Sequence, residues 1–104
     1  MSGGDNYTKN KIVERMVGEW AFKKDGTEVT VKIGSRKLSI TTTIKGTSTL
    51  EEISAGSQWF NDKLLFTEKQ KYYVKHADEF ELIFGEVKAP ALNDVLWERK
   101  FERS

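Results

Sequence analysis

The sequence predicts an all-β protein: a small antiparallel up-and-down β-barrel of eight or nine short strands, preceded by a short N-terminal helix. After position 18 apolar residues alternate with polar ones, which is the period of a strand with one buried face. Tight-turn signals recur at short, even spacing, and no segment is long enough to cross over between parallel strands. We expect the sheet to close into a barrel because closure removes two long exposed edges.

The chain has 104 residues, the length of one domain. Residues 1–6 are polar and contain two glycines, so we expect them to form a disordered tip. Residues 7–104 are expected to form a single barrel domain that includes a helix over residues 7–17.

The predicted helix carries one apolar stripe, made of Ile12, Val13, Met16 and Val17. Gly18 follows, and glycine commonly ends a helix. A helix this short is not stable alone, so its stripe must lie on the sheet, where it could cover the open end of the barrel.

The strands are separated by residue pairs typical of tight turns. Asp25-Gly26 predicts the first hairpin, and Lys45-Gly46 and Asn61-Asp62 predict later turns. The segment 88–93, which contains the single proline, is expected to be the longest late loop. The side chains expected to point inward are those of Trp20, Phe22, Val29, Val31, Ile33, Leu38, Ile40, Leu50, Val74, Phe80, Leu82, Phe84 and Trp97.

Composition excludes several classes of function. Lys and Arg total 17 and Asp and Glu total 16, whereas a nucleic-acid binder needs a cation for each phosphate that it neutralises. We therefore expect no nucleic-acid partner. No apolar stretch is long enough for a membrane span, and there is no cysteine and no secretory signal. These features predict a cytoplasmic protein without disulfides.

The sequence offers no catalytic or cofactor motif. Phosphate-binding and dinucleotide-binding glycine patterns are absent, as is the Gly-x-Ser-x-Gly of hydrolases. The single histidine, His76, lies beside Asp78 and Glu79 and is either a pH switch or general base or, as we favour, an exposed turn residue. We expect no enzyme activity, no metal and no cofactor.

The segment Gly18-Glu19-Trp20, placed before a β-meander, resembles the first strand of the calycin superfamily, which includes the lipocalins and fatty-acid-binding proteins. The resemblance implies that a basic residue of the last strand packs across the first-strand tryptophan. Arg99 is the residue expected to stack on Trp20 as a cation–π pair. The Arg-x-Tyr of fatty-acid-binding proteins corresponds here to Arg99-Lys100-Phe101, which lacks the tyrosine hydroxyl.

We therefore expect a small lipocalin-like barrel that binds a hydrophobic small molecule, such as a fatty acid, without catalysis. Tyr72 and Arg99 would orient the polar end of the ligand; alternatively, Arg99 only seals one end of the barrel. The predicted ligand-binding residues are Trp20, Phe22, Ile40, Thr42, Tyr72, Val74, Phe84, Trp97 and Arg99.

The alternative function is a protein-interaction module, or a dimer, with a filled barrel core and no ligand. Trp59 and Phe60 stand next to a predicted turn, where exposed aromatic residues are typical of interfaces. The sequence thus suggests these two residues as the contact of a homodimer.

Overall fold

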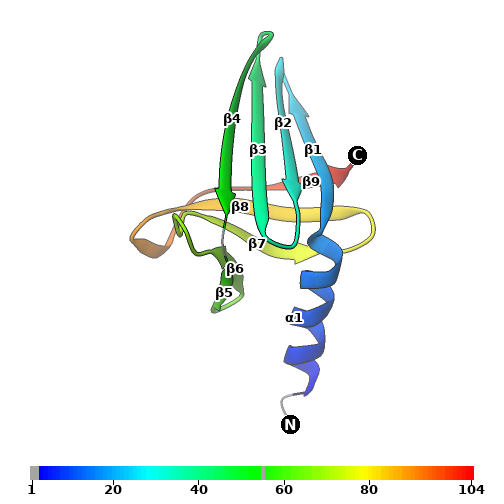
Figure 1. Ribbon diagram of the computed structural model, residues 1–104, viewed down its shortest axis with the longest axis vertical. Helices are drawn as coiled ribbons and strands as arrows, with labels where there is room; N and C mark the ends of the chain where they lie inside the picture. The colour runs from blue at the N-terminus through cyan, green and yellow to red at the C-terminus, as the bar shows by residue number, and fades with distance from the viewer. Residues whose placement is uncertain (1–2, 55) are drawn as a thin grey trace.

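The structure is a computed structural model that describes residues 3–54 and 56–104. Within these residues one helix, α1 (Gly3–Met16), precedes nine antiparallel strands in a single sheet (Figure 1). The prediction of an all-β fold with an N-terminal helix is confirmed. The strands are β1 (Gly18–Lys24), β2 (Thr27–Ile33), β3 (Lys37–Ile44), β4 (Thr47–Ser54), β5 (Ser57–Phe60), β6 (Lys63–Phe66), β7 (Tyr72–Ala77), β8 (Glu81–Lys88) and β9 (Ala91–Arg103).

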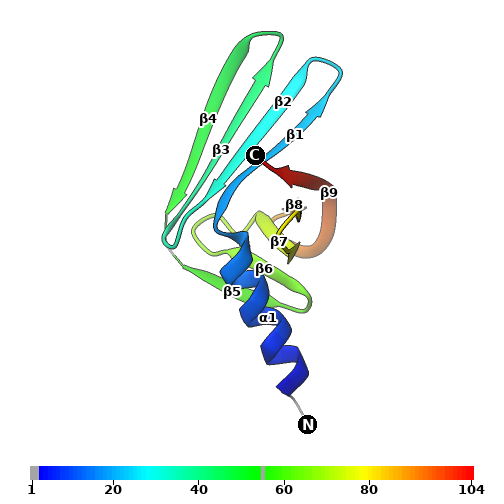
Figure 2. The ribbon, with the colours of Figure 1, turned by 90° about the vertical axis from the view of Figure 1, so that its right-hand side faces the viewer.

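The sheet has the strand order of an up-and-down barrel with one seam open. Its order is β4-β3-β2-β1-β9-β8-β7-β6-β5, so two meanders are joined where β1 pairs with β9. Strands β4 and β5 are consecutive in the chain but do not pair, which leaves the sheet unclosed. Strands β1–β4 stand across β7 and β8 and reach beyond them at their upper ends (Figures 1 and 2).

The β1–β2 and β3–β4 hairpins have the turns that their sequences predict. Asp25 and Gly26 have φ values of 47° and 82°, and Lys45 and Gly46 have values of 50° and 86°. Positive φ at both central residues is required in the type of two-residue turn that matches the twist of paired strands. By contrast, the expected loop 88–93 is a two-residue turn, because β8 continues to Lys88 and β9 already begins at Ala91.

Helix α1 starts at Gly3 rather than at position 7, so residues 3–6 of the expected disordered tip are helical, while residues 1–2 lie outside the described part. Only Ile12 and Met16 are buried, whereas Val13 and Val17 are largely exposed. The helix packs against β7, and residues at i and i+4 are enough to line such a narrow contact. It lies below the sheet, away from the upper ends of β1–β4 (Figure 2).

The main hydrophobic core lies between the two meanders. Two residues expected to point inward do not: Leu50 is 61% exposed and Phe80 is 76% exposed. On β4 the buried residue is Ile53, so strand alternation places Leu50 on the outer face. Phe80 precedes the start of β8 and belongs to a turn. The buried residues of the main core include Trp20, Val31, Ile33, Leu38, Ile40, Ile53, Leu64, Val74, Leu82, Phe84 and Phe101.

A second, smaller core lies on the other face of β6–β8, and sequence alternation did not single it out. It contains Leu65, Tyr73 and Val87, with Phe60 packed against it, whereas Trp59 packs against the main core. Trp59 and Phe60 are therefore partly buried on opposite faces of β5, and the prediction that they form one exposed pair is wrong.

Trp20 is covered by a different arginine from the one expected. The guanidinium of Arg103, not of Arg99, lies over the Trp20 indole, 4.1 Å from the ring centroid. The register between β1 and β9 places Trp20 directly opposite Arg103. Arg99 lies four residues earlier on the same face of β9. The prediction therefore chose the correct face of the strand but the wrong position along it.

Candidate functional site

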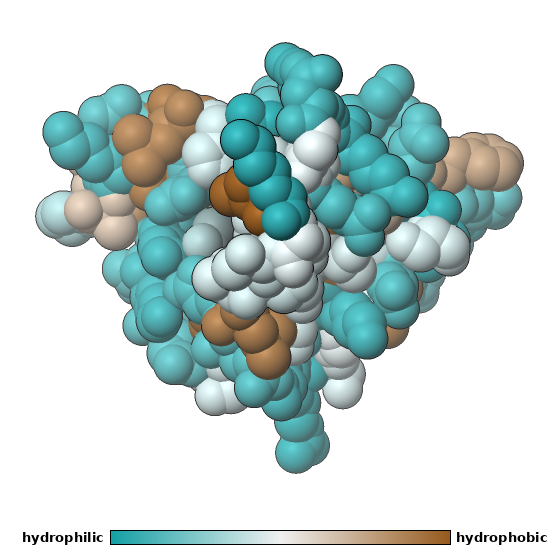
Figure 3. All heavy atoms as spheres, turned by 90° about the horizontal axis from the view of Figure 1, so that it is seen from above, coloured by the Kyte–Doolittle hydropathy of each residue, from teal (hydrophilic) through white to brown (hydrophobic). Residues whose placement is uncertain are grey.

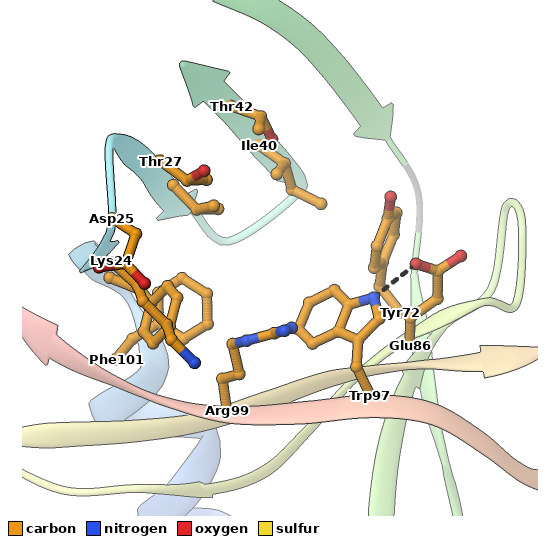
Figure 4. A pocket seen from close by; sticks show the side chains of 12 residues that line it. Lys24, Asp25, Thr27, Ile40, Thr42, Tyr72, Glu86, Trp97, Arg99 and Phe101 are labelled. Carbon is orange, nitrogen blue, oxygen red and sulfur yellow. Dashed lines mark hydrogen bonds between the residues drawn. The ribbon is translucent and has the colours of Figure 1, made fainter. Parts of the chain in front are cut away.

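A cavity of about 460 Å³ lies between the two meanders, and its lining reaches the β1–β2 turn at Lys24, Asp25 and Thr27. Its walls come from β1, β2 and β3 on one side and from β7, β8 and β9 on the other (Figure 4). A volume of this size is within the range of small-molecule pockets. The lining residues are Phe22, Lys24, Asp25, Thr27, Val29, Ile40, Thr42, Tyr72, Glu86, Trp97, Arg99 and Phe101.

Strand β9 supplies one wall of the cavity, because Trp97, Arg99 and Phe101 alternate onto the same face. The Arg99 guanidinium lies 5.4 Å from the Phe22 ring centroid and 5.2 Å from the Trp97 ring centroid. Phe22 in turn contacts Phe101, with 5.7 Å between their ring centroids. The result is a cation held among aromatic rings at the edge of the main core.

The polar atoms of Trp97, Glu86 and Tyr72 form hydrogen bonds within the protein. The Trp97 indole Nε1 donates a hydrogen bond to Glu86 Oε1 at 2.8 Å (Figure 4). The Tyr72 hydroxyl donates to Glu51 Oε1, also at 2.8 Å. Burial and the neighbouring Glu51 carboxylate raise the pKa of Tyr72 well above its usual value. Tyr72 is thus a neutral donor committed to Glu51, and does not offer its proton to a molecule in the cavity.

Glu51 belongs to a polar cluster that bridges the open seam of the sheet. Lys69 and Lys71 lie 2.8 Å and 3.3 Å from its Oε2 atom. Burial of the Glu51 carboxyl opposes ionisation, but the hydrogen bonds from Lys69, Tyr72 and Lys71 outweigh it and lower the pKa of Glu51. These contacts connect β4 to β7 by side chains where no backbone ladder forms.

Arg99 is one of four charged residues that line the cavity, with Lys24, Asp25 and Glu86, and it is the one held between two aromatic rings. Among residues 3–54 and 56–104 its guanidinium makes no hydrogen bond or ion pair, and its contacts are the two aromatic rings. Its side chain rises from β9 and turns toward the Trp97 ring, while Ile40 and Thr42 lie on the opposite wall of the cavity (Figure 4). A guanidinium can donate two parallel hydrogen bonds to a carboxylate or a phosphate. The cavity therefore combines an aromatic wall with two cationic side chains, Arg99 and Lys24, and two carboxylates, Asp25 and Glu86.

The structure brings together only part of the predicted ligand site. Trp20, Val74 and Phe84 lie fully buried in the main core and do not reach the cavity. The predicted residues that do line it are Phe22, Ile40, Thr42, Tyr72, Trp97 and Arg99.

The prediction missed three charged lining residues, Lys24, Asp25 and Glu86, and for Lys24 and Glu86 the sequence contains a signal. The alternation Trp20, Phe22 continues to Lys24, and the alternation Leu82, Phe84 continues to Glu86. Both positions are two residues beyond the point at which the apolar pattern stops. A polar residue that follows apolar residues on the same face of a strand indicates where the core ends and an accessible cavity begins.

His76, Asp78 and Glu81 could bring ligand atoms within 4.8 Å of one another, close enough for a cation. However, Asp78 Oδ1 accepts hydrogen bonds from the backbone amides of Phe80 and Glu81, both at 2.8 Å. Its Oδ2 lies 3.0 Å from His76 Nε2. Asp78 thus organises the turn between β7 and β8. His76 itself lies within β7 and is half-buried, so the expectation of an exposed turn residue is wrong.

Searches of protein-family models, of curated proteins and of solved structures find no match for this chain. In the described part of the chain, no helix has the length and apolar character needed to cross a bilayer. The site is therefore interpreted from its own geometry.

Proposed function

We propose that this protein binds a small amphipathic molecule with an acidic head group, such as a fatty acid, and does not transform it chemically. The observation that carries the proposal is the placement of Arg99 at the edge of an apolar cavity of about 460 Å³ without an acidic partner. The apolar part of the ligand would lie against Phe22, Ile40 and Trp97, and its acidic group would pair with the Arg99 guanidinium.

Arg99 lacks hydrogen-bond acceptors for its guanidinium in the described part of the chain. Its guanidinium is stacked on rings that accept no conventional hydrogen bond, so its donors face solvent. The carboxylate of an amphipathic ligand would accept hydrogen bonds from the Arg99 guanidinium. The apolar chain of the same ligand would displace water from the aromatic wall of the cavity. An uncharged ligand of equal length would gain only the free energy of burying its apolar chain.

A calycin-like relationship is also proposed, and the cluster of Gly18, Trp20 and Arg103 supports it. A basic residue of the last strand covering the first-strand tryptophan is what the resemblance implies, and Arg103 occupies that position. The alternative of a filled core without a ligand is less well supported, because the core ends in an open cavity.

Competition with an environment-sensitive anionic dye, 8-anilinonaphthalene-1-sulfonate, tests the proposal. Dodecanoate and dodecanol are compared as competitors, because they differ in the head group and share the chain. We expect dodecanoate to bind at least roughly tenfold more tightly, the effect of about 1.4 kcal/mol from the added ion pair. Arg99→Met should abolish this preference while leaving dodecanol binding nearly unchanged.

A matched pair of variants locates the ligand. Thr42 and Thr43 are adjacent on β3 but point to opposite faces, and only Thr42 lines the cavity. Thr42→Trp should fill the cavity and remove dye binding, whereas Thr43→Trp should leave it intact. The absence of saturable binding to the unmodified protein, or equal loss in both variants, would overturn the proposal.

A further inference from the structure

We propose that β4 pairs antiparallel with β4 of a second copy of this chain, which would join two sheets into one continuous sheet. Strand β4 stands at the end of the strand order and pairs with β3 alone in the described residues. It is eight residues long, and Ile53 is its only buried residue. A long strand with an unpaired edge is a template for another strand.

The two ends of the sheet differ in how they are protected. The other edge strand, β5, has only four residues, which is one of the ways in which proteins limit edge pairing. Strand β4 contains no proline and no lysine, and its register with β3 runs from Thr47 to Ser54 without a bulge. Two further devices are present only in part: Glu51 is a charged residue on the inner face but is paired with Lys69 and Lys71, and Glu68 caps the edge only at Ser54.

The backbone groups on the free edge can be assigned from one hydrogen bond. The Ser54 amide donates outward to Glu68 Oε2 at 2.7 Å, so residue 54 faces away from β3. In an antiparallel ladder the backbone groups of successive residues point alternately to the two sides. Ser48, Leu50 and Glu52 therefore also present their amides and carbonyls to the free edge, where the described residues provide no strand to accept them.

The side chains of β4 are compatible with pairing about a two-fold axis at Leu50. In that register Leu50 meets its own copy, Glu52 lies opposite Ser48, and Glu51 lies opposite Thr49, so no two carboxylates are directly opposed. Leu50 is 61% exposed in the single chain and would become covered. This register thus pairs the free backbone groups of β4 and places no like charges directly opposite each other.

The two carboxylates of β4, those of Glu51 and Glu52, form ion pairs with lysines of the same chain. Glu51 contacts Lys69 and Lys71, and Glu52 forms an ion pair with Lys37. Seen from above, the molecule shows small hydrophobic areas separated by hydrophilic side chains (Figure 3). Backbone pairing at an edge therefore suits this chain better than association through that face. Since one strand pair is a small interface, the dimer should dissociate on dilution.

Sedimentation velocity over a concentration series tests the proposal, up to about 1 mM, where even a weak self-association is populated. We expect a monomer–dimer equilibrium in the unmodified protein. Leu50→Lys should weaken it at least tenfold, because two ammonium groups would then face each other across the axis. The matched control is Leu96→Lys, which places the same change at a leucine of β9 that is 55% exposed. It should dimerise like the unmodified protein.

A cross-linking measurement fixes the register. The chain has no cysteine, so Leu50→Cys introduces a single thiol. Directly opposed residues of a hydrogen-bonded pair have Cα atoms about 5.5 Å apart, a separation that a disulfide can span. Mild oxidation should yield a covalent dimer for Leu50→Cys and little for Leu96→Cys. A strictly monomeric unmodified protein, a dimer insensitive to Leu50→Lys, or equal cross-linking of both thiols would each overturn the proposal.

Discussion

The guanidinium of Arg103 covers the indole of Trp20 and connects the last strand to the C-terminal end of α1. Trp20 is completely buried, and its Nε1 atom donates to the Met16 carbonyl at 2.9 Å. Arg103 Nη2 donates to the carbonyl of Arg15 at 2.9 Å, and its Nε donates to that of Glu79 at 3.2 Å. One side chain of the last strand thereby holds the end of α1 and the turn between β7 and β8 against β1.

Replacing this guanidinium tests its contribution to stability. Arg103→Lys keeps the charge but loses the planar group that covers Trp20 and the donors that reach several carbonyls at once. We expect the free energy of unfolding to fall by about 1–3 kcal/mol. Urea denaturation followed by tryptophan fluorescence measures the change. Arg36→Lys, at an exposed arginine between β2 and β3, is the control and should change stability little.

Gly18 is required next to Arg103. Its φ is +145°, and a Cβ atom at this position would lie 2.5 Å from Arg103 Nη1. Gly18→Ala should lower the free energy of unfolding by about 1–3 kcal/mol through backbone strain and displacement of the guanidinium. Gly34→Ala is the matched control, since its Cβ would make only an ordinary 3.6 Å contact with the Lys37 carbonyl. Equal losses in the two variants would contradict this explanation.

Asp78 should give the protein a specific sensitivity to acid. The hydrogen bond with His76, followed by those from the amides of Phe80 and Glu81, lowers the pKa of Asp78 to about 2. A carboxyl whose pKa is depressed by folding stabilises the folded state above its unfolded pKa, and this stabilisation is lost as pH falls through the folded value. The free energy of unfolding should therefore decline between about pH 4 and pH 2.

The Asp78→Asn variant separates this contribution from the general effect of acid. It should be less stable than the unmodified protein at neutral pH and should lose less stability on acidification, as measured by urea denaturation at several pH values. Asp94→Asn, at an exposed aspartate of β9, should retain the full pH dependence. An unchanged pH profile in Asp78→Asn would show that another carboxyl is responsible.

The side-chain contact between β4 and β7 should depend on Glu51. Glu51→Ala removes the acceptor of Tyr72 and the partner of Lys69 and Lys71, so we expect faster amide hydrogen exchange in β4. The free energy of unfolding should also fall by about 1–2 kcal/mol, because the buried Tyr72 hydroxyl loses its partner. The neighbouring Glu52→Ala is the control, since Glu52 points to the other face. If both variants exchange equally fast, the side-chain cluster does not hold the seam.

Short-range features were predictable because they depend on a few consecutive residues. Asp25-Gly26 and Lys45-Gly46 adopt positive φ at both positions whatever the rest of the chain does, and strand alternation follows from the pleat. Most of the apolar cavity wall follows from the same alternation. The second core around Tyr73 could not be predicted, because only Tyr73 among the residues on its side of β7 is buried, and the exposed Lys75 two residues later marks that side as polar.

The residue sequence alone determined the strand class, the tight turns and which side chains share a face. Tertiary structure decided that Arg103 rather than Arg99 covers Trp20, that Arg99 is left free beside the cavity, and that β4 and β5 stay apart. The physical reason is that a pattern of period two is unchanged by a shift of two or four residues. The register of strands far apart in the chain, and the closure of the sheet, are therefore settled only when complete side chains pack together.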